Sequence, residues 1–263
     1  METDNTLAIS ITAARNKADY DAVCKRLLSE KIILAWILKR CLKEFEAYDV
    51  HEIAERFIEG QPQVSEVPLA PDETGSVIRG LSQENASLVE GKVFFDIYFT
   101  VIVPGTEETV QLIVNVEAQN KFYPGYPLIK RGVFYGSRMI SAQDGSVFTK
   151  SHYEKLRKVY SIWICTNPPK KRENTITRYH IAEENLIGNV HEKKEYYDLL
   201  SVIMICLGEP GGENEDGLLK LLETLLSREM PPEEKKRILR EEFDIPMTQT
   251  LEKEVSLMCN LSD

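Results

Sequence analysis

Apolar and polar residues alternate with a period of two between Phe94 and Asn120, and this pattern predicts a β-hairpin. β-Branched and aromatic residues dominate both halves, as a half-buried sheet requires. One apolar face is formed by Phe95, Ile97, Phe99, Val101, Val103, Val110, Leu112, Val114, Val116 and Ala118. The turn between the two strands is predicted at Pro104 to Glu108. We therefore take this hairpin as the centre of the predicted fold.

Helical spacing precedes the hairpin. Apolar residues at three- and four-residue steps predict a helix from about Asp19 to Phe45. A shorter helix is predicted over Val50 to Glu59. Gln61 to Thr74 contains prolines and predicts a loop, and Ser76 to Leu81 predicts an edge strand.

Further elements follow the hairpin. A helix is predicted over Leu128 to about Ala142, although two glycines fall inside it. Val159 to Cys165 is apolar throughout and predicts an interior strand. Thr175 to Ala182 predicts another strand, whereas Leu199 to Leu207 fits either a strand or a buried helical segment.

A Gly-rich acidic stretch, residues 208–217, predicts a boundary late in the chain. We expect one domain over residues 1–207, a linker over 208–217 and a helical C-terminal appendage over 218–263. The helices of the appendage are predicted at Leu218–Arg228, Pro232–Phe243 and Gln249–Met258. A homo-oligomer formed through these helices is an open expectation.

Composition limits the class of protein. With 263 residues and 43% apolar content, the chain can bury a core and does not resemble a disordered protein. Its five cysteines are odd in number and include no CxxC pair, so neither a disulfide framework nor a zinc site is expected. The most apolar stretches are far shorter than the roughly 20 residues that a transmembrane helix needs. We expect a cytoplasmic protein that does not enter the membrane.

Charge is distributed unevenly along the chain. The whole sequence carries a formal net charge of -10, but residues 121–172 contain eleven Lys and Arg against two acids. That segment is therefore +9 and the remainder -19. A basic block directly after the hairpin fits a polyanionic partner such as DNA. The alternative is a set of scattered, solvated lysines.

Two carboxylates are the first candidates for chemistry. If the hairpin is symmetric about Thr106 and Glu107, Asp96 lies opposite Glu117, with Cβ atoms about 4.5 to 5.5 Å apart. Gln119 follows on the same face. Two acids this close require a proton or a cation between them, and oxygen ligands of this kind suit Mg²⁺ or Mn²⁺. The alternative is the ordinary solvated face of an antiparallel sheet.

A second candidate group lies on the helix after the hairpin. Arg131, Tyr135 and Arg138 fall at i, i+4 and i+7 and share one helical face. Because a helix N-terminus attracts anions, these side chains suit a phosphate grip beside the carboxylates. The alternative is a surface cation pair packed over a tyrosine. Glu30, within the first predicted helix, fits a solvated helix residue when it is considered alone.

Several common chemistries lack their motifs. The four histidines show no HExxH or paired spacing, so zinc hydrolysis is not expected. The sequence has no GxSxG elbow, no Walker loop and no GxGxxG after a strand. Serine hydrolases, nucleotide hydrolases and dinucleotide-dependent enzymes are therefore disfavoured.

The combination of Asp96 with Glu117-Ala118-Gln119 resembles the PD-(D/E)xK nuclease superfamily, in the branch where glutamine replaces the motif lysine. The flanking sequence resembles the bacterial PD-(D/E)xK family of transposase-like proteins related to Rpn-type recombination-promoting nucleases. The segments that carry this resemblance are EKIILAWILK, LIVNVEAQN, YPLIKRGVFYGSRMIS, KVYSIWIC and the terminal MCNLS. Together they extend from about residue 15 to the end of the chain.

The resemblance implies a restriction-endonuclease-like α/β fold with an αβββαβ core and a mixed central sheet. It implies that Asp96, Glu117 and the Ala118 carbonyl hold Mg²⁺ or Mn²⁺. Gln119 stands where a lysine usually orients the attacking water, and Glu30 matches the position of an additional acid. A neutral amide cannot offset developing negative charge, so the metal must do more of the work.

From these features we expect a metal-dependent DNA endonuclease linked to transposition or recombination. The residues expected to contact phosphate are Lys121, Lys130, Arg131, Tyr135 and Arg138. One alternative is a catalytically weak or inactive DNA-binding or assembly protein that retains the nuclease scaffold. Another is an acidic module that binds only proteins.

Overall fold

The computed structural model describes residues 18–64, 96–105, 109–117, 122, 124–209 and 216–260. It is a mixed α/β structure built on a six-stranded sheet with the strand order β1-β2-β3-β4-β6-β5. The strands are β1 (Gln63–Val64), β2 (Ile97–Ile102), β3 (Thr109–Glu117), β4 (Val159–Cys165), β5 (Thr175–His180) and β6 (Leu200–Cys206). Strands β1, β2 and β3 pair antiparallel, β3, β4 and β6 pair parallel, and β5 is antiparallel to β6 at the edge. The mixed sheet expected from the sequence is therefore present.

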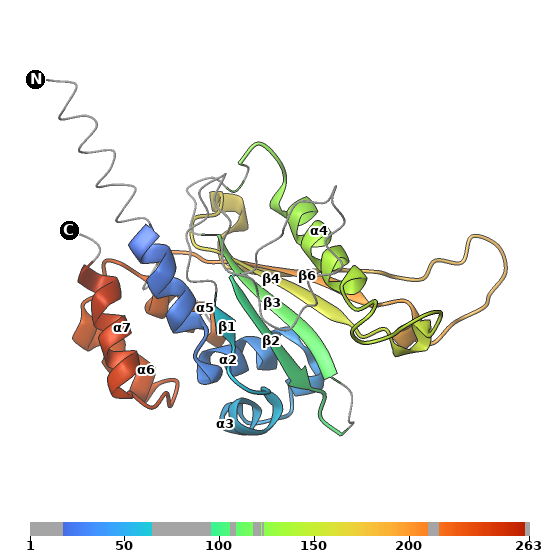
Figure 1. Ribbon diagram of the computed structural model, residues 1–263. Coiled ribbons are helices and arrows are strands. Elements are labelled where there is room, and N and C mark those ends of the chain that lie inside the picture. The colour runs from blue at the N-terminus through green and yellow to red at the C-terminus, as the bar shows by residue number, and fades with distance from the viewer. Residues whose placement is uncertain are drawn as a thin grey trace, which may run out of the picture.

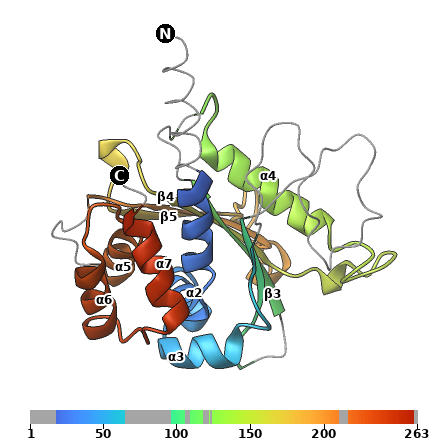
Figure 2. The same cartoon turned by 60° about the vertical axis from the view of Figure 1, so that its left-hand side comes forward.

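Helices cover both faces of this sheet (Figures 1 and 2). A helix over residues 18–28 begins the described chain. The α- and π-helical elements that follow are α2 (Lys31–Cys41), α3 (Val50–Glu52), the π-helix η2 (Ile53–Phe57), α4 (Leu128–Ser141), α5 (Gly217–Leu226), α6 (Pro232–Glu241) and α7 (Gln249–Asn260). Short 3₁₀ turns are η1 (Lys43–Phe45), η4 (Tyr153–Lys155), η5 (Lys170–Arg172) and η6 (Lys194–Tyr196). Helix α4 lies on one face of the sheet, and α2, α5, α6 and α7 lie on the other.

The residues of strand β4 contribute to the hydrophobic cores on both faces of the sheet. All seven of its residues are buried, as the apolar run predicted. Val159, Trp163 and Cys165 belong to the cluster under α4, whereas Tyr160 and Ile162 belong to the larger cluster on the opposite face. The period of two thus divides one apolar run between two cores.

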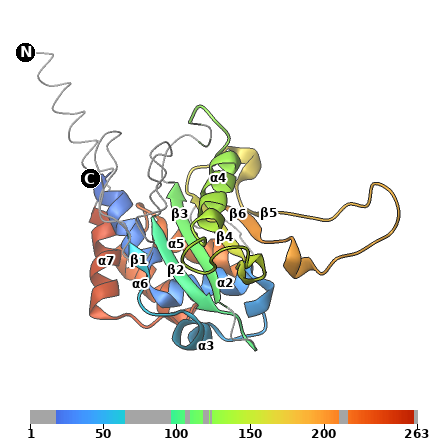
Figure 3. The same cartoon turned by 45° about the vertical axis from the view of Figure 1, so that its right-hand side comes forward.

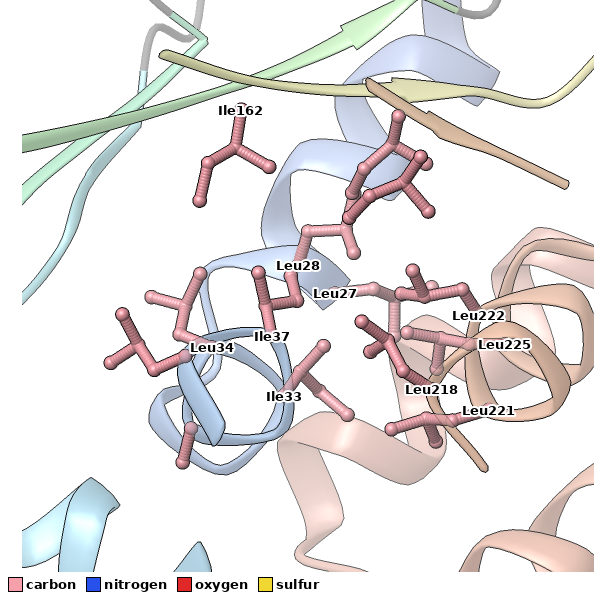
Figure 4. Packing of buried hydrophobic residues seen from close by; sticks show 14 of the residues in the cluster. Leu27, Leu28, Ile33, Leu34, Ile37, Ile162, Leu218, Leu221, Leu222 and Leu225 are labelled. Carbon is pink, nitrogen blue, oxygen red and sulfur yellow. The ribbon is translucent and has the colours of Figure 1, made fainter. Parts of the chain in front are cut away.

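The larger core joins the two ends of the chain (Figure 4). It brings together leucines and isoleucines of the residue 18–28 helix, α2 and α5, namely Leu27, Leu28, Ile33, Leu34, Ile37, Leu218, Leu221, Leu222 and Leu225. Ile162 of β4 belongs to the same cluster. The helices predicted as a C-terminal appendage therefore share one hydrophobic core with the first helices.

The first predicted helix is interrupted. It ends at residue 28, and α2 begins at Lys31, so the prediction of one helix to Phe45 is wrong. Glu30 is not inside a helix: it is the N-cap residue of α2, with an extended backbone (φ -62°, ψ 127°). The apolar spacing continues across the break because both helices bury leucines in the same core. The spacing of apolar residues therefore could not reveal the break between the two helices.

The hairpin is confirmed, but its register differs from the symmetric prediction. Ile97 pairs with Val114, which shifts the partner of each β2 residue by two positions along β3. A shift of two keeps every residue on its predicted face, because side chains repeat every second residue. Asp96 precedes β2 and is not the backbone partner of Glu117. The predicted turn centre at Thr106 and Glu107 lies outside the described residues.

The segment before the hairpin also differs from the prediction. Strand β1, at Gln63–Val64, lies where only a loop was expected, and it pairs with Ile97 and Tyr98 of β2. The strand predicted at Ser76–Leu81 lies outside the described residues.

Two glycines bring α4 close to the sheet. A Cβ atom on Gly132 would lie 2.6 Å from Val202 Cγ1 and 2.9 Å from Trp163 Nε1. A Cβ atom on Gly136 would lie 2.1 Å from Leu200 Cδ1. These glycines are unfavourable for helix formation by themselves, but any larger residue would push α4 off β4 and β6. The predicted helix is therefore confirmed together with the reason for its glycines.

Candidate active site at the Asp96 edge of the sheet

Asp96 lies at one edge of the sheet, immediately before the first residue of β2. Strand β3 runs antiparallel to β2 and ends at Glu117, so the start of β2 and the end of β3 meet at the same edge. The Cα of Glu117 pairs with Cys165, the last residue of β4. This is the carboxyl end of the parallel strands, where α/β sheets commonly bind ligands.

Asp96 makes an ion pair with a lysine that the sequence analysis did not single out. Lys25 Nζ lies 3.0 Å from Asp96 Oδ1 and 2.5 Å from Asp21 Oδ2, and its side chain is only 9% exposed. Burial opposes the charge on Lys25, but the two carboxylates outweigh it and raise the pKa of the ammonium. Asp96 therefore faces a cation. The only signal in the sequence was a lysine within an apolar helical stretch, next to Cys24 and near Leu27.

Glu30 lies beside the C-terminal helices. Burial raises the pKa of its carboxyl, and the nearby carboxylate of Glu254 on α7 raises it further. Arg26 Nε donates a hydrogen bond of 2.9 Å to Glu254 Oε2. The carboxylate whose charge raises the pKa of Glu30 thus belongs to α7. The two residues are too far apart in the sequence for a local pattern to indicate this contact.

On α4, the predicted shared face is partly buried. The Arg131 guanidinium lies 5.2 Å from the centre of the Tyr135 ring and 5.4 Å from that of Trp163. Its Nη2 donates a hydrogen bond of 2.9 Å to the Tyr135 hydroxyl. Lys130 is exposed and Arg138 is half-buried. Arg131 is therefore held by aromatic rings and presents a positioned cation rather than a freely moving one.

Two thiols end the parallel strands at the same edge. Cys165 of β4 and Cys206 of β6 are Cα partners, and both are buried free cysteines. A hydrogen bond from Cys165 is the largest cause of a lowered pKa at Cys206, and burial opposes it. The two cysteines, about forty positions apart in the sequence, gave no spacing signal.

A cavity of about 450 Å³ lies elsewhere, between α2, β5 and the start of α5. Its lining includes Trp36, Arg40, Arg178 and Asp216, and none of the residues predicted for the active site. Arg40 Nε lies 2.6 Å from Asp216 Oδ2, and Asp216 caps α5 by accepting from Leu218 N. The ion pair at this cavity therefore connects α2 to the start of α5.

Asp96 is the one predicted metal ligand whose side chain falls within the described structure. The side chain of Glu117 lies outside it, as do Ala118, Gln119 and Lys121 entirely. Among the residues that are described, no group of three or more His, Cys, Asp or Glu side chains could hold a metal ion. No helix among all the described residues is long and apolar enough to cross a membrane.

Comparison with known proteins gives no relative. No family model, no curated protein and no solved structure matches this chain.

Proposed function

We propose that the protein is a metal-dependent DNA endonuclease of the restriction-endonuclease-like, PD-(D/E)xK type, acting in transposition or recombination. The observation that carries the proposal is the placement of Asp96 and the end of β3, at Glu117, on one edge of the sheet. Among the described elements, α2 is followed by the short helical turns η1, α3 and η2 and then by β1, β2, β3, α4 and, after the 3₁₀ turn η4, β4. This series contains the αβββαβ order that the sequence resemblance implies, and so supports the proposal. The parallel pairing of β3 and β4 through α4 supports it as well.

In this proposal Asp96, Glu117 and the Ala118 carbonyl hold Mg²⁺ or Mn²⁺. The bound ion would act as a Lewis acid on the phosphoryl oxygen and lower the pKa of its water. Gln119 would donate a hydrogen bond to the attacking water, and Glu30 would serve as the additional acid that the resemblance implies.

Lys25 adds a charge that Gln119 cannot supply. Gln119 is neutral, whereas Lys25 remains protonated because its pKa is raised beside Asp96 and Asp21. In this proposal the Lys25 ammonium would partly offset the negative charge that Asp96, Asp21 and a bound phosphate bring together at this edge. It also holds the Asp96 carboxylate in place through the 3.0 Å contact.

The DNA backbone would follow the basic segment after the hairpin. Arg131 suits a phosphate contact because its guanidinium is already oriented by Tyr135 and Trp163. Lys130 is exposed on the same helix, and Arg138 and Lys121 complete the proposed contacts. Each phosphate contact contributes to a salt-dependent affinity.

A plasmid-nicking assay tests the proposal. The parent protein should nick supercoiled DNA with Mg²⁺ or Mn²⁺ and stop in EDTA, and Asp96→Asn or Glu117→Gln should lose about 10²-fold or more in rate. Glu234→Gln, at an exposed acid of α6, is the matched control and should nick like the parent. Equal nicking by the parent and both site variants would sink the assignment.

A second function is favoured by one specific contact. The Lys25 ammonium at 3.0 Å can neutralise Asp96 without any metal ion, as a protein that has lost cleavage would require. Such a DNA-binding or assembly protein would bind duplex DNA in a salt-sensitive manner without metal-dependent nicking. Its affinity would be unchanged by Glu117→Gln.

A further inference from the structure

A long connection between β5 and β6 projects from the molecule (Figures 1 and 3). Every residue from 180 to 196 is exposed. We call residues 181–192 the arm. Long connections without secondary structure of their own are uncommon in compact domains, and binding loops are frequent among them.

The tip of the arm is apolar. Leu186 is 86% exposed, Ile187 97% and Val190 70%. Single exposed aliphatic residues are ordinary, but three within five positions at the end of a projection form a patch typical of an interaction site.

Hydrogen bonds inside the arm hold this tip in shape. Glu183 Oε1 lies 2.7 Å from His191 Nδ1, and Glu183 Oε2 accepts from the backbone N–H of Glu192 at 2.8 Å. Asn185 Oδ1 accepts from the N–H of Val190 at 3.1 Å. These bonds join the outgoing and returning halves of the arm, so that the tip can bind with little further ordering.

The charge of the arm narrows the choice of partner. The arm contains Glu183, Glu184 and Glu192 and no Lys or Arg, and it is followed directly by Lys193, Lys194 and Glu195. The exposed residues 180–196 thus carry four acids against two lysines, a net charge of -2 with His neutral. Anionic lipid and nucleic acid would repel it. Two tips meeting each other would bring like charges together. The fitting partner is an apolar surface flanked by cations.

The outer face of α4 has that chemistry. Phe134 is 54% exposed and Val133 is 42% exposed. Lys130 and Arg138 lie four residues before and after Phe134, so they flank it along one helical face. In Figures 1 and 3 the arm extends beyond α4 on the side of the molecule away from α6 and α7. This placement allows two copies to exchange arms around a two-fold axis.

We propose that the arm tip of one copy packs against the outer face of α4 of a second copy, forming a homodimer. Leu186 and Ile187 cover Phe134 and Val133, and the arm's glutamates face Lys130 and Arg138. The inference concerns association without nucleic acid. Because Lys130 and Arg138 are also proposed phosphate contacts, DNA and the arm of a second copy would compete for this face of α4.

The test measures molar mass by light scattering during size-exclusion chromatography, without DNA. The parent should be a dimer, and the variants Leu186→Asp/Ile187→Asp and Phe134→Asp should each be monomers with unchanged circular dichroism. Tyr196→Asp changes an exposed aromatic residue outside the arm, 61% exposed, and should remain a dimer. A monomeric parent overturns the proposal, as does a dimer that persists in both the tip and the α4 variants.

A mixing experiment tests the contact itself. Ile187→Cys and Phe134→Cys proteins, mixed and oxidised, should form a disulfide-linked dimer containing one chain of each kind. Each protein oxidised alone provides the background from native cysteines. A mixture that cross-links no more than this background contradicts the arrangement.

Discussion

The Lys25 ammonium lies 3.0 Å from the Asp96 carboxylate and thereby joins the first described helix to the start of β2. Asp96 is 22% exposed and Lys25 is nearly buried, so water screens this pair less than a surface ion pair. The contact therefore affects both the stability of the fold and the chemistry of the edge where β3 ends.

Replacing Lys25 by methionine should destabilise the protein. The variant leaves Asp96 and Asp21 without their shared cation, and we expect a loss of about 1–3 kcal/mol in the free energy of unfolding. Urea denaturation measures this loss. In a double-mutant cycle with Asp96→Asn, the two losses should not add, because both changes remove the same contact. Strict additivity would show that the pair contributes nothing.

The same pair predicts a response to alkaline pH. The folded-state pKa of Lys25 is raised above its unfolded value, so its stabilisation is fully present below that unfolded value, about 10.4. It is lost as the pH rises through the higher folded-state pKa. The difference in unfolding free energy between the parent and Lys25→Met should thus be constant from pH 7 to 9 and shrink in more alkaline buffer. A difference that stays constant throughout would contradict the raised pKa.

Glu30→Gln should stabilise the protein at neutral pH. The folded-state pKa of Glu30 is raised, so its ionisation costs stability as the pH rises above the unfolded value, about 4.3. We expect a gain of less than about 1 kcal/mol at pH 7 and none below pH 4, since Glu30 is only half-buried. Thermal unfolding of the parent and of Glu30→Gln, at pH 7 and below pH 4, measures this gain in stability. The control is Glu229→Gln, at an exposed acid between α5 and α6, which should change neither value. A loss of nicking in Glu30→Gln would identify Glu30 as the additional acid.

Gly132→Ala should destabilise α4 despite improving its helix propensity. Alanine contributes about 1 kcal/mol in a helix interior, but its Cβ would lie 2.6 Å from Val202 and 2.9 Å from Trp163. Overpacking of this kind costs about 1–3 kcal/mol, so the net change should be a loss. Ser137→Ala, at an exposed position of the same helix, should be neutral or slightly stabilising. Equal stability of both variants would mean that α4 can move away freely.

Leu222→Ala should cost about 2–5 kcal/mol, because Leu222 is completely buried among helices from both ends of the chain. The matched control is Leu186→Ala on the arm, which should change the stability of the monomer by less than about 0.5 kcal/mol, since Leu186 is 86% exposed. Denaturant titration compares the two. A small effect of Leu222→Ala would mean that α5 is not part of the core.

Most elements of the fold could be predicted from local pattern. The predicted bounds of the strand Val159–Cys165 are those of β4, because a run of seven apolar residues indicates a buried strand without any information on its neighbours. Leu200–Cys206 proved to be a strand, a choice that periodicity left open, because its parallel pairing with β4 is a tertiary contact. The break before α2 was missed because both helices bury the same face.

The candidate site was predictable only in part. The alternation of apolar and polar residues correctly predicted that Asp96 lies near the end of β3. It could do so because side chains repeat on the same face at every second residue, whatever the exact pairing of the strands. The exact register depends on the turn, and it differed by two residues. Lys25 was invisible because its partner Asp96 lies 71 positions away and no local spacing connects them.

The shared core has a kinetic consequence. Leu218 follows Leu27 by 191 positions, so the first helices cannot complete the burial of their leucines until α5 has been made. At a synthesis rate of about 5–20 residues per second, that interval lasts roughly 10 to 40 s. During this time an apolar surface of the newly made chain is exposed on the ribosome, where it is open to chaperones and to misassembly. Synthesis of α5 then supplies the leucines that complete this core.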